Sequence, residues 1–377
     1  MTYAVDSLAS SRHGTWVEIR LSRLLQNLKT LKTFGRPDTA VLAVVKANAY
    51  GHGLLPISQA LKEHVDYFGV SSLREAMALR EKDPALPVLV FGRLFSEELP
   101  VAIEHDLTLS LSSLEEAEEV SAVSRSLGRK TTVHIKVDTG MGRLGIACRQ
   151  ARGIIEKISA LESLVLEGLY THFPTAEKED GFAQGQLQSF EKLILALQER
   201  NITFRYRHAA NSAGIVKTAH PALNLLRPGL SLYGIYPDAA LEDQIALAPI
   251  LSLKSKLISV KKLGAGESCG YGRTFVAAQP TTIGILPVGY SHGYPFQASN
   301  RASVLYQGRR YPLAGRVSMD YLAVDFGTTA VRAWEEITLI GESQNAKIRV
   351  EELAAWSNTI PYEIVTRLLP SLPRYYA

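Results

Sequence analysis

The sequence predicts an α/β protein, with an N-terminal (β/α)8 barrel of the TIM type followed by a mainly antiparallel β domain. Between residues 39 and 234, eight β-branched apolar runs alternate with helix-like segments. After about residue 245 the runs become short, alternate apolar with polar residues and are interrupted by Gly and Pro, which is typical of antiparallel β structure. A chain of 377 residues is also too long for one small core, so we expect two domains.

The barrel follows from the number of strands. Eight parallel strands and their helices in about 200 to 250 residues favour a closed barrel. An open doubly wound sheet is the alternative, but no G-x-G-x-x-G follows the first strand, which disfavours a dinucleotide-binding sheet. The expected strands lie at 39–46, 66–72, 87–92, 107–113, 131–140, 164–172, 204–211 and 223–234.

Helices are expected between these strands. Segment 114–128 has the clearest boundaries, because Ser113 and Glu116 have the spacing of a capping box and Gly128 ends the pattern. The other expected helices lie at 54–63, 73–81, 96–105, 148–161 and 183–200.

The domain boundary is expected near residue 245, in a stretch that resembles a linker. This gives a barrel over 1–245 and a β-rich domain over 246–377. The stretch 15–22 is also strand-like and precedes the eight barrel strands. Pairing with the C-terminal sheet is therefore an alternative to a place in the barrel for this stretch.

Composition excludes several classes of protein. The net charge is only +4 and no block of Lys and Arg stands out, so we expect no nucleic-acid partner. Two cysteines, Cys148 and Cys269, give neither a disulfide framework nor a metal motif, and no His-x-x-x-His pair is present, so no metal is expected. No apolar run approaches about 18 residues, and the first residues lack the pattern of a signal peptide. We therefore expect a cytoplasmic enzyme with no membrane span.

Polar residues stand where the predicted barrel strands end, which is where barrel enzymes carry their catalytic groups. Each has an ordinary structural explanation: a solvated lysine, an exposed charge in a tight turn, a buried histidine, a helix N-cap or an ion pair. Together they favour a site, because all would meet at one end of the barrel. These residues are Lys46, Arg143, His172, Asn211, Ser212 and Arg227.

These residues are suited to binding one kind of cofactor. A lysine at a barrel mouth can form a Schiff base with a carbonyl cofactor. Backbone N–H groups near Ser212, Gly229 and Leu230 can bind a phosphate, since barrel phosphate sites often follow the seventh and eighth strands. A carbonyl cofactor with a phosphate group is pyridoxal 5′-phosphate (PLP).

Seven motifs in order identify a family resemblance that covers almost the whole chain. The motifs are AVVKANAYGHG, VDTGMGRLG, LYTHF, HAANSA, RPGLSLYG, GYGRTF and GRVSMD. Together they closely resemble the PLP-dependent alanine racemase family. The resemblance implies a (β/α)8 barrel with a β-rich C-terminal domain, a homodimer, and interconversion of L- and D-alanine that supplies D-alanine for peptidoglycan.

The resemblance also implies residue roles. Lys46 corresponds to the Schiff-base lysine and one base, and Tyr271 corresponds to the opposing catalytic tyrosine. Arg227 faces the cofactor's pyridine nitrogen, Arg143 orients the substrate carboxylate, and Lys136, which many members carry carbamylated, positions Arg143. Tyr271, Met319 and Asp320 come from the other subunit, and Tyr290 lines the access route. The remaining implied cofactor contacts are Tyr50, His172, Asn211, Ser212, Gly229, Leu230 and Tyr362.

The implied reaction agrees with the residue types. Racemisation removes a proton from one face of Cα and returns it on the other, so two opposed groups are expected. Arg227 keeps its own proton and leaves the ring nitrogen neutral, which limits side reactions, whereas related barrel decarboxylases have a glutamate there. This disfavours a decarboxylase. A non-catalytic PLP-binding protein is disfavoured by the C-terminal domain that carries Tyr271.

Some residues depart from the family pattern. Asn48 stands where many members have aspartate, and we expect little effect. His292 and Phe296 remove an acid and an arginine from the stretch that lines substrate access with Tyr290. The sequence therefore leaves the substrate range open, and a racemase of serine or of a broader set of amino acids is the alternative.

Overall fold

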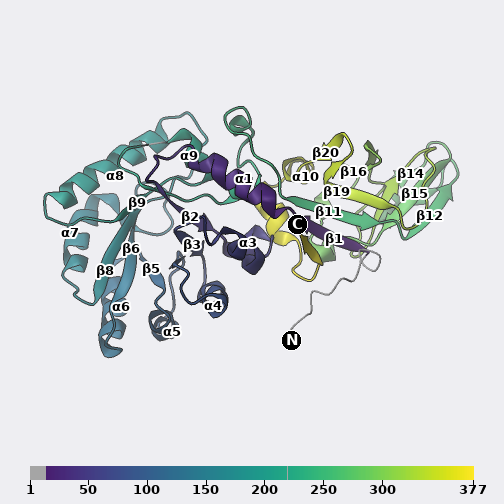
Figure 1. The fold of residues 1–377 in the computed structure, drawn as a ribbon. Helices are drawn as coiled ribbons and strands as arrows, with labels where there is room; N and C mark the ends of the chain where they lie inside the picture. Colours follow the sequence, from purple (N-terminus) through teal and green to yellow (C-terminus); the bar gives the residue numbers. More distant parts are fainter. Residues whose placement is uncertain (1–13, 219) are drawn as a thin grey trace. The chain divides into compact units, whose positions relative to one another are not determined.

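The computed structural model describes residues 14–218 and 220–377 and divides them into two compact units (Figure 1). One unit is Arg23–Ala248. The other combines residues 14–22 with Pro249–Ala377. The chain thus leaves the first unit three residues later than the expected boundary at 245 (248 against 245), and residues 14–22 belong with the C-terminal part.

The unit Arg23–Ala248 is built around parallel strands in the order β10-β2-β3-β4-β5-β6-β8-β9. Two backbone hydrogen bonds join the ends of this sheet, from Asn224 N to Arg207 O at 3.0 Å and from Arg227 N to Ala210 O at 3.1 Å. The sheet therefore closes into the predicted barrel. Its strands are β2 (Ala40–Val44), β3 (Tyr67–Val70), β4 (Val88–Val90), β5 (Thr108–Leu111), β6 (Thr131–Asp138), β8 (Leu164–Tyr170), β9 (Tyr206–His208) and β10 (Leu225–Leu226); the short β7 (Ile146–Ala147) pairs with β6.

Helices surround these strands on the outside of the barrel (Figure 1). Ser113 caps α6 by accepting a hydrogen bond from Glu116 N, and the Glu116 carboxylate accepts one from Ser112 N, so the predicted start of this helix is confirmed. No helix in the described part of the chain is long and apolar enough to cross a bilayer. The helices are α1 (Leu21–Lys32), α3 (Leu54–Leu61), α4 (Leu73–Lys82), α5 (Leu99–Glu104), α6 (Leu114–Ser126), α7 (Cys148–Ser159), α8 (Phe182–Gln198) and α9 (Ser212–Lys217).

The eighth strand is much shorter than the run at 223–234 predicted. Only Leu225–Leu226 pair with β2, and Pro228 and Gly229 follow. Proline has no N–H to give to a strand ladder, which ends the pairing there. The chain then forms a 3-10 helix, η1 (Leu230–Tyr233), so the end of the predicted strand is a helix start.

Aromatic and histidine rings fill the barrel interior together. Tyr170 stacks on His208 with ring centroids 4.7 Å apart and planes 4° apart, and the Tyr170 hydroxyl is 2.6 Å from Ser110 Oγ. His208 Nε2 lies 2.9 Å from Nδ1 of His134, and both histidines are fully buried. Burial lowers the pKa of both rings, so both stay neutral in the folded protein.

The second unit is mainly antiparallel β structure, as predicted. Its main sheet has the order β17-β16-β19-β11-β1-β21, with β20 paired to β19. β1 (Thr15–Ile19) pairs antiparallel with β11 and parallel with β21, so this stretch lies in the C-terminal sheet. The other strands of this sheet are β11 (Leu251–Lys256), β16 (Ser303–Tyr306), β17 (Arg309–Pro312), β19 (Glu336–Ser343), β20 (Ala346–Ile348) and β21 (Arg374–Tyr376).

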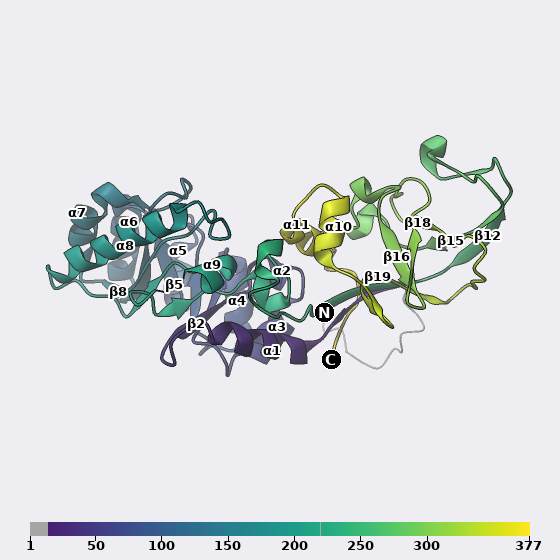
Figure 2. The same ribbon diagram turned by 90° about the horizontal axis from the view of Figure 1, so that it is seen from above.

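Smaller elements complete this unit. A three-stranded sheet contains β12 (Ser259–Leu263), β15 (Thr281–Leu286) and β18 (Leu322–Asp325), and a hairpin contains β13 (Ser268–Cys269) and β14 (Phe275–Val276). Two helices that the sequence did not predict, α10 (Val350–Trp356) and α11 (Pro361–Arg367), pack against each other, with α10 beside β19 (Figure 2).

The buried histidines predict that the free energy of unfolding falls as the pH drops below about 6.5. In the unfolded chain His134 and His208 each take up a proton near that pH, whereas the folded protein keeps both rings neutral. Through these two rings alone the unfolded state then binds up to two more protons, so they contribute up to about 2.7 kcal/mol of lost stability per pH unit. Denaturant unfolding between about pH 7.5 and 5.5 measures this slope.

Two variants make this prediction specific. His208→Gln should reduce the change in unfolding free energy per pH unit by the amount that corresponds to one bound proton. His64→Gln, at an exposed histidine, should leave this slope unchanged. Equal slopes for the wild type and His208→Gln would contradict the assignment.

Candidate active site

Lys46 follows β2 after a single residue, Val45, and begins an unusual turn. Ala47, Asn48 and Ala49 have φ of 53°, 55° and 52° with ψ near 50°, and Tyr50 has φ of 52°. These are the dihedrals of a left-handed helix, which residues other than Gly, Asn and Asp rarely adopt. The hydrogen bonds Ala49 N to Val45 O and Gly51 N to Ala47 O close it. The strand therefore delivers Lys46 and Tyr50 in one tight left-handed turn.

Side chains from other elements hold this turn in place. The Asn48 N–H donates to the Glu75 carboxylate at 3.2 Å, and the Asn48 side-chain oxygen accepts a hydrogen bond from Leu54 N at 2.8 Å. His52 stacks on Tyr233 with ring centroids 4.4 Å apart, and the Tyr233 hydroxyl donates to the carbonyl of Val44 at 2.9 Å. The turn is thus fixed from both ends.

Tyr50, Ser212 and Gly229 meet at the starts of α9 and η1. A Cβ at Gly229 would lie 2.8 Å from the Tyr50 hydroxyl and 3.7 Å from Ser212 Oγ, so no side chain fits there. Ser212 Oγ accepts hydrogen bonds from Gly229 N at 3.0 Å and Ser231 N at 3.2 Å. Hydroxyls and helix-start N–H groups at a glycine form a small cradle suited to an anion. Leu230, the first residue of η1, is fully buried beside it.

Asn211 acts as a helix cap, the structural alternative that its sequence position suggested. Its side-chain oxygen accepts a hydrogen bond from Gly214 N at 2.9 Å, and its amide donates to the carbonyl of Phe173 at 3.0 Å. Asn211 therefore fixes the start of α9, and with it the position of Ser212.

Arg227 is buried at the end of β10. Its guanidinium donates to the carbonyls of Thr171 and Ala209 at 2.9 Å, and its Nη1 lies 2.8 Å from His208 Nδ1. Nη2 is also 3.3 Å from His172 Nδ1. Because arginine only donates, His172 accepts through Nδ1 and carries its proton on Nε2. Burial first, and then the charge of Arg227, lower the pKa of His172 to about 2, so this ring is neutral.

Cations gather around Lys46. Burial first, and then the charges of Arg143 and Arg227, lower the pKa of Lys46, while Glu75 partly opposes them. Lys136 has the same environment, and burial together with Arg143 and Arg227 lowers its pKa to about 8. The lowered pKa of both amines favours the neutral form, which is the nucleophilic and proton-accepting form of a lysine.

Two contacts hold the loop that carries Arg143. The Asp138 carboxylate accepts hydrogen bonds from the N–H groups of Gly140, Met141 and Gly142, which fixes the turn after β6. Gln186 on α8 is buried and donates to Thr139 Oγ1 at 3.1 Å and to the carbonyl of His172 at 3.3 Å. Gln186 thus links the ends of β6 and β8.

The second unit carries the other five predicted residues. Ser291 Oγ donates to the Asp320 carboxylate and to the carbonyl of Met319, so the segment around Tyr290 lies beside 318–320. Tyr271 lies in the 3-10 helix η3 (Tyr271–Arg273), and the residue is 72% exposed. Met319 and Tyr290 are exposed as well. Tyr362 is the second residue of α11.

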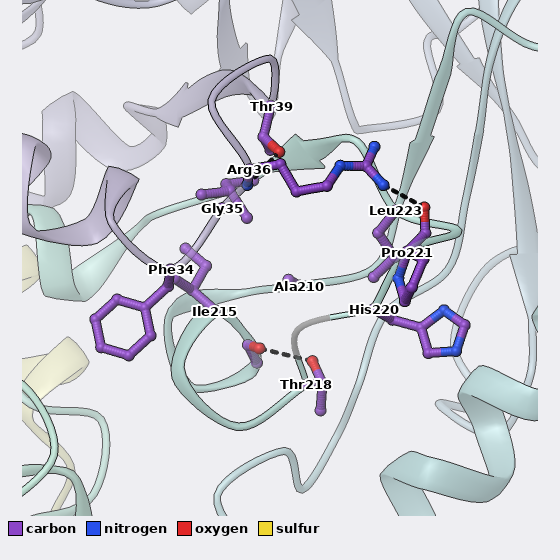
Figure 3. Close-up of a pocket in the computed structure, with 12 residues that line it drawn as sticks. Phe34, Gly35, Arg36, Thr39, Ala210, Ile215, Thr218, His220, Pro221 and Leu223 are labelled. Carbon is purple, nitrogen blue, oxygen red and sulfur yellow. Dashed lines mark hydrogen bonds between the residues drawn. The ribbon is translucent and has the colours of Figure 1, made fainter.

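A separate cavity of about 250 Å³ lies between the loop after α1, the helix α9 and residues 220–226 (Figure 3). Polar groups at this cavity are bonded to the main chain: Arg36 Nη1 donates to the carbonyl of Pro221 and Thr218 Oγ1 to that of Gly214. None of the predicted site residues lines it. Among residues 14–218 and 220–377, no cluster of His, Cys, Asp and Glu has the arrangement of a metal site.

Sequence reasoning missed several residues that shape this site. Thr171 and His208 lie inside the motifs LYTHF and HAANSA but were given no role, and Glu75 lies outside every motif. All three contact Asn48 or Arg227 only in the folded chain. The left-handed turn had a partial signal, because Gly51 and Gly53 flank it.

Comparisons with known proteins agree with this architecture. The family described as "Alanine racemase, N-terminal domain" matches residues 19–237, and "Alanine racemase, C-terminal domain" matches residues 250–376. The chain is 37% identical to the alanine racemase of Desulforamulus reducens, over 96% of this chain and 98% of that protein. It is also 37% identical to the alanine racemase of Methanococcus maripaludis, over 97% and 99%.

Solved structures show the same likeness. The alanine racemase of Clostridium difficile 630 superposes with a TM-score of 0.92 at 32% identity, covering 97% of this chain and 96% of that one. The alanine racemase from Streptomyces coelicolor A3(2) gives a TM-score of 0.92 at 30% identity, covering 98% and 99%. With both domains matched and nearly the full length aligned, the chain belongs to the alanine racemase family.

Proposed function

We propose that this protein interconverts L- and D-alanine, with PLP as its cofactor. One observation supports it above the others: a lysine with a lowered pKa and a hydroxyl-lined cradle come together at the strand ends of a barrel whose relatives are alanine racemases. We further propose that the protein works in the cytoplasm and that its D-alanine serves peptidoglycan.

The residues present fit PLP. At the cradle, Gly229 leaves room that a Cβ would fill beside Tyr50 and Ser212, and this suits a phosphate group held by hydroxyls and N–H groups. Lys46 would hold the aldehyde carbon covalently. Arg227 would face the pyridine nitrogen, and the remaining cofactor contacts would be His172, Asn211, Leu230 and Tyr362.

When bound, PLP supplies a sink for the electron pair left on Cα after proton removal. The protein's part is to move the proton. Lys46 Nζ takes it from, or returns it to, one face of Cα, and its lowered pKa favours the neutral amine that this role needs. Tyr271 Oη serves the opposite face. Arg143, positioned by Lys136, binds the substrate carboxylate.

We propose that the protein is a homodimer in which the second unit of one subunit completes the barrel of the other. Tyr271, Met319 and Asp320 would then be donated by the partner, and Tyr290 would line substrate access. The exposure of Tyr271, Met319 and Tyr290 supports this, because large apolar and aromatic side chains exposed together often mark an interaction surface.

The activity itself is tested with purified protein, PLP and L-alanine. D-alanine should form, whereas Lys46→Ala should give no racemisation and lose the visible absorbance of covalently held cofactor, because no other residue takes over the attachment. Enantiomer analysis by chiral chromatography and an absorbance spectrum measure these outcomes. A panel with serine and a basic amino acid measures the substrate range. Absence of D-alanine at every PLP concentration would refute the proposal.

Gly229→Ala tests the cradle. Its Cβ would press on the Tyr50 hydroxyl at 2.8 Å, so we expect the Kd for PLP to rise at least about tenfold, the size expected of overpacking. Gly185→Ala is the matched control, because nothing lies within 4 Å of a Cβ there. Titration of the apoprotein with PLP measures both. Equal affinities of the two variants would place the phosphate elsewhere.

Tyr271→Phe tests the two-base assignment. The variant should slow proton removal from L-alanine more than from D-alanine, because only one face of Cα loses its base. Primary deuterium isotope effects measured in each direction report this difference, and equal effects would argue against it. If Tyr271 is donated by the partner, mixing Lys46→Ala and Tyr271→Phe subunits should restore part of the activity.

A further inference from the structure

A chain of hydrogen bonds crosses the barrel interior from Arg227 to Glu167. Arg227 Nη1 is 2.8 Å from His208 Nδ1, His208 Nε2 is 2.9 Å from His134 Nδ1, and His134 Nε2 is 3.3 Å from Glu167 Oε2. Both histidines are fully buried, and the Glu167 side chain is 15% exposed. Nothing in the proposed reaction uses His134 or Glu167.

We call this chain of hydrogen bonds from Arg227 to Glu167 the relay. Arg227, at one end, determines which atom donates and which accepts in every bond of the relay. Arginine has only N–H donors, so Nδ1 of His208 must accept. A neutral imidazole then carries its proton on Nε2 and donates it to His134 Nδ1, and by the same logic His134 donates through Nε2 to Glu167. Arg227 therefore donates at one end of the relay and Glu167 accepts at the other.

The groups around Glu167 keep it an acceptor. Burial raises the pKa of this carboxyl, but hydrogen bonds from His134 and Tyr67 and the charge of Arg205 outweigh burial and hold the pKa below its usual value. The Tyr67 hydroxyl donates to Glu167 Oε2 at 2.5 Å. Burial and this contact raise the pKa of Tyr67, so it stays a donor. Glu167 thus accepts from two buried donors at one oxygen.

We propose that Glu167 is a positioning residue for Arg227. Because Glu167 accepts a hydrogen bond from His134 at the far end of the relay, both histidines keep their proton on Nε2. The unprotonated Nδ1 of His208 then remains as an acceptor for the Arg227 guanidinium. Reversal of the relay would turn an N–H of His208 toward Nη1 of Arg227, and two donors would then face each other at 2.8 Å. The carbonyls of Thr171 and Ala209 hold only the other side of the guanidinium, through Nη2.

The relay also lowers the cost of a buried cation. The ring dipoles of His208 and His134 point the same way, with lone pairs toward Arg227 and N–H groups toward Glu167. Aligned hydrogen bonds polarise one another, which stabilises the positive and negative ends together. The effect on racemisation rests on the proposed function, whereas the proton positions do not.

The proton positions are tested on the holoenzyme by 15N NMR of the histidine side chains. In the wild type, His134 and His208 should both be neutral with the proton on Nε2. Glu167→Gln, which keeps a carbonyl oxygen as acceptor, should preserve this pattern. Glu167→Leu removes the acceptor and should change the His134 signals. A proton on Nδ1 of either histidine in the wild type would overturn the proposal, even if the protein had no racemase activity.

Kinetics separate positioning from a loss of stability. Glu167→Leu removes the acceptor of the His134 N–H, while the Tyr67 hydroxyl still has Thr108 Oγ1 at 3.2 Å. We expect kcat to fall roughly tenfold, the effect of leaving the His134 donor without an acceptor, with a smaller change in KM. Tyr67→Phe removes the other donor to Glu167 and leaves the relay intact, so it should keep kcat. Glu162→Gln, at an exposed position, is the surface control. Wild-type histidine signals and kcat in Glu167→Leu would refute the role.

Discussion

The left-handed turn at Ala47–Tyr50 is the constraint on which the site depends. A left-handed conformation costs about 1 to 2 kcal/mol for each residue other than glycine, and this turn has four in succession. Such strain persists only where the surroundings determine the conformation. Here Glu75 fixes the turn through Asn48, and the Tyr233 hydroxyl fixes the end of β2, so the turn cannot relax without breaking buried contacts.

Positive charge is the second constraint. Lys46, Lys136, Arg143 and Arg227 lie close enough that the charges of the arginines lower the pKa of both lysines. Cations so arranged disfavour one another, and the same charges attract an anion bound among them. A phosphate and a carboxylate are the anions that the proposed cofactor and substrate bring. The charge pattern that makes Lys46 a usable base therefore also favours binding of its ligands.

The strand ends could be predicted from sequence because apolar runs mark strands and parallel strands share one direction. Lys46, His172 and Arg227 were assigned to the carboxyl end on this basis, and all three lie there. What could not be predicted depends on contacts distant in sequence. Glu75 lies outside every motif, and the motifs that contain Thr171 and His208 do not reveal that these residues contact Arg227. The helices α10 and α11 lie in a domain whose short alternating runs indicated only strands.

The eighth strand was predicted at the correct place in the barrel but with the wrong length. The apolar run at 223–234 correctly indicated an eighth barrel position, but Pro228 has no N–H for the ladder and the pairing stops at Leu226. This early stop has a functional consequence. If the strand continued, the N–H groups of Gly229 and Ser231 would enter the ladder, whereas in η1 they meet Ser212 Oγ.

The predicted site residues named below are buried in the first unit and exposed in the second, and the proposed reaction explains this difference. In the barrel, Ser212, Arg227 and Gly229 are buried and bonded, so their positions are determined by this chain alone. In the second unit, Tyr271, Met319 and Tyr290 are exposed. A reaction that needs bases on opposite faces of Cα can take one from the barrel that carries Lys46 and the other from a separate surface. The exposed set is therefore what an enzyme needs if its second base comes from another surface.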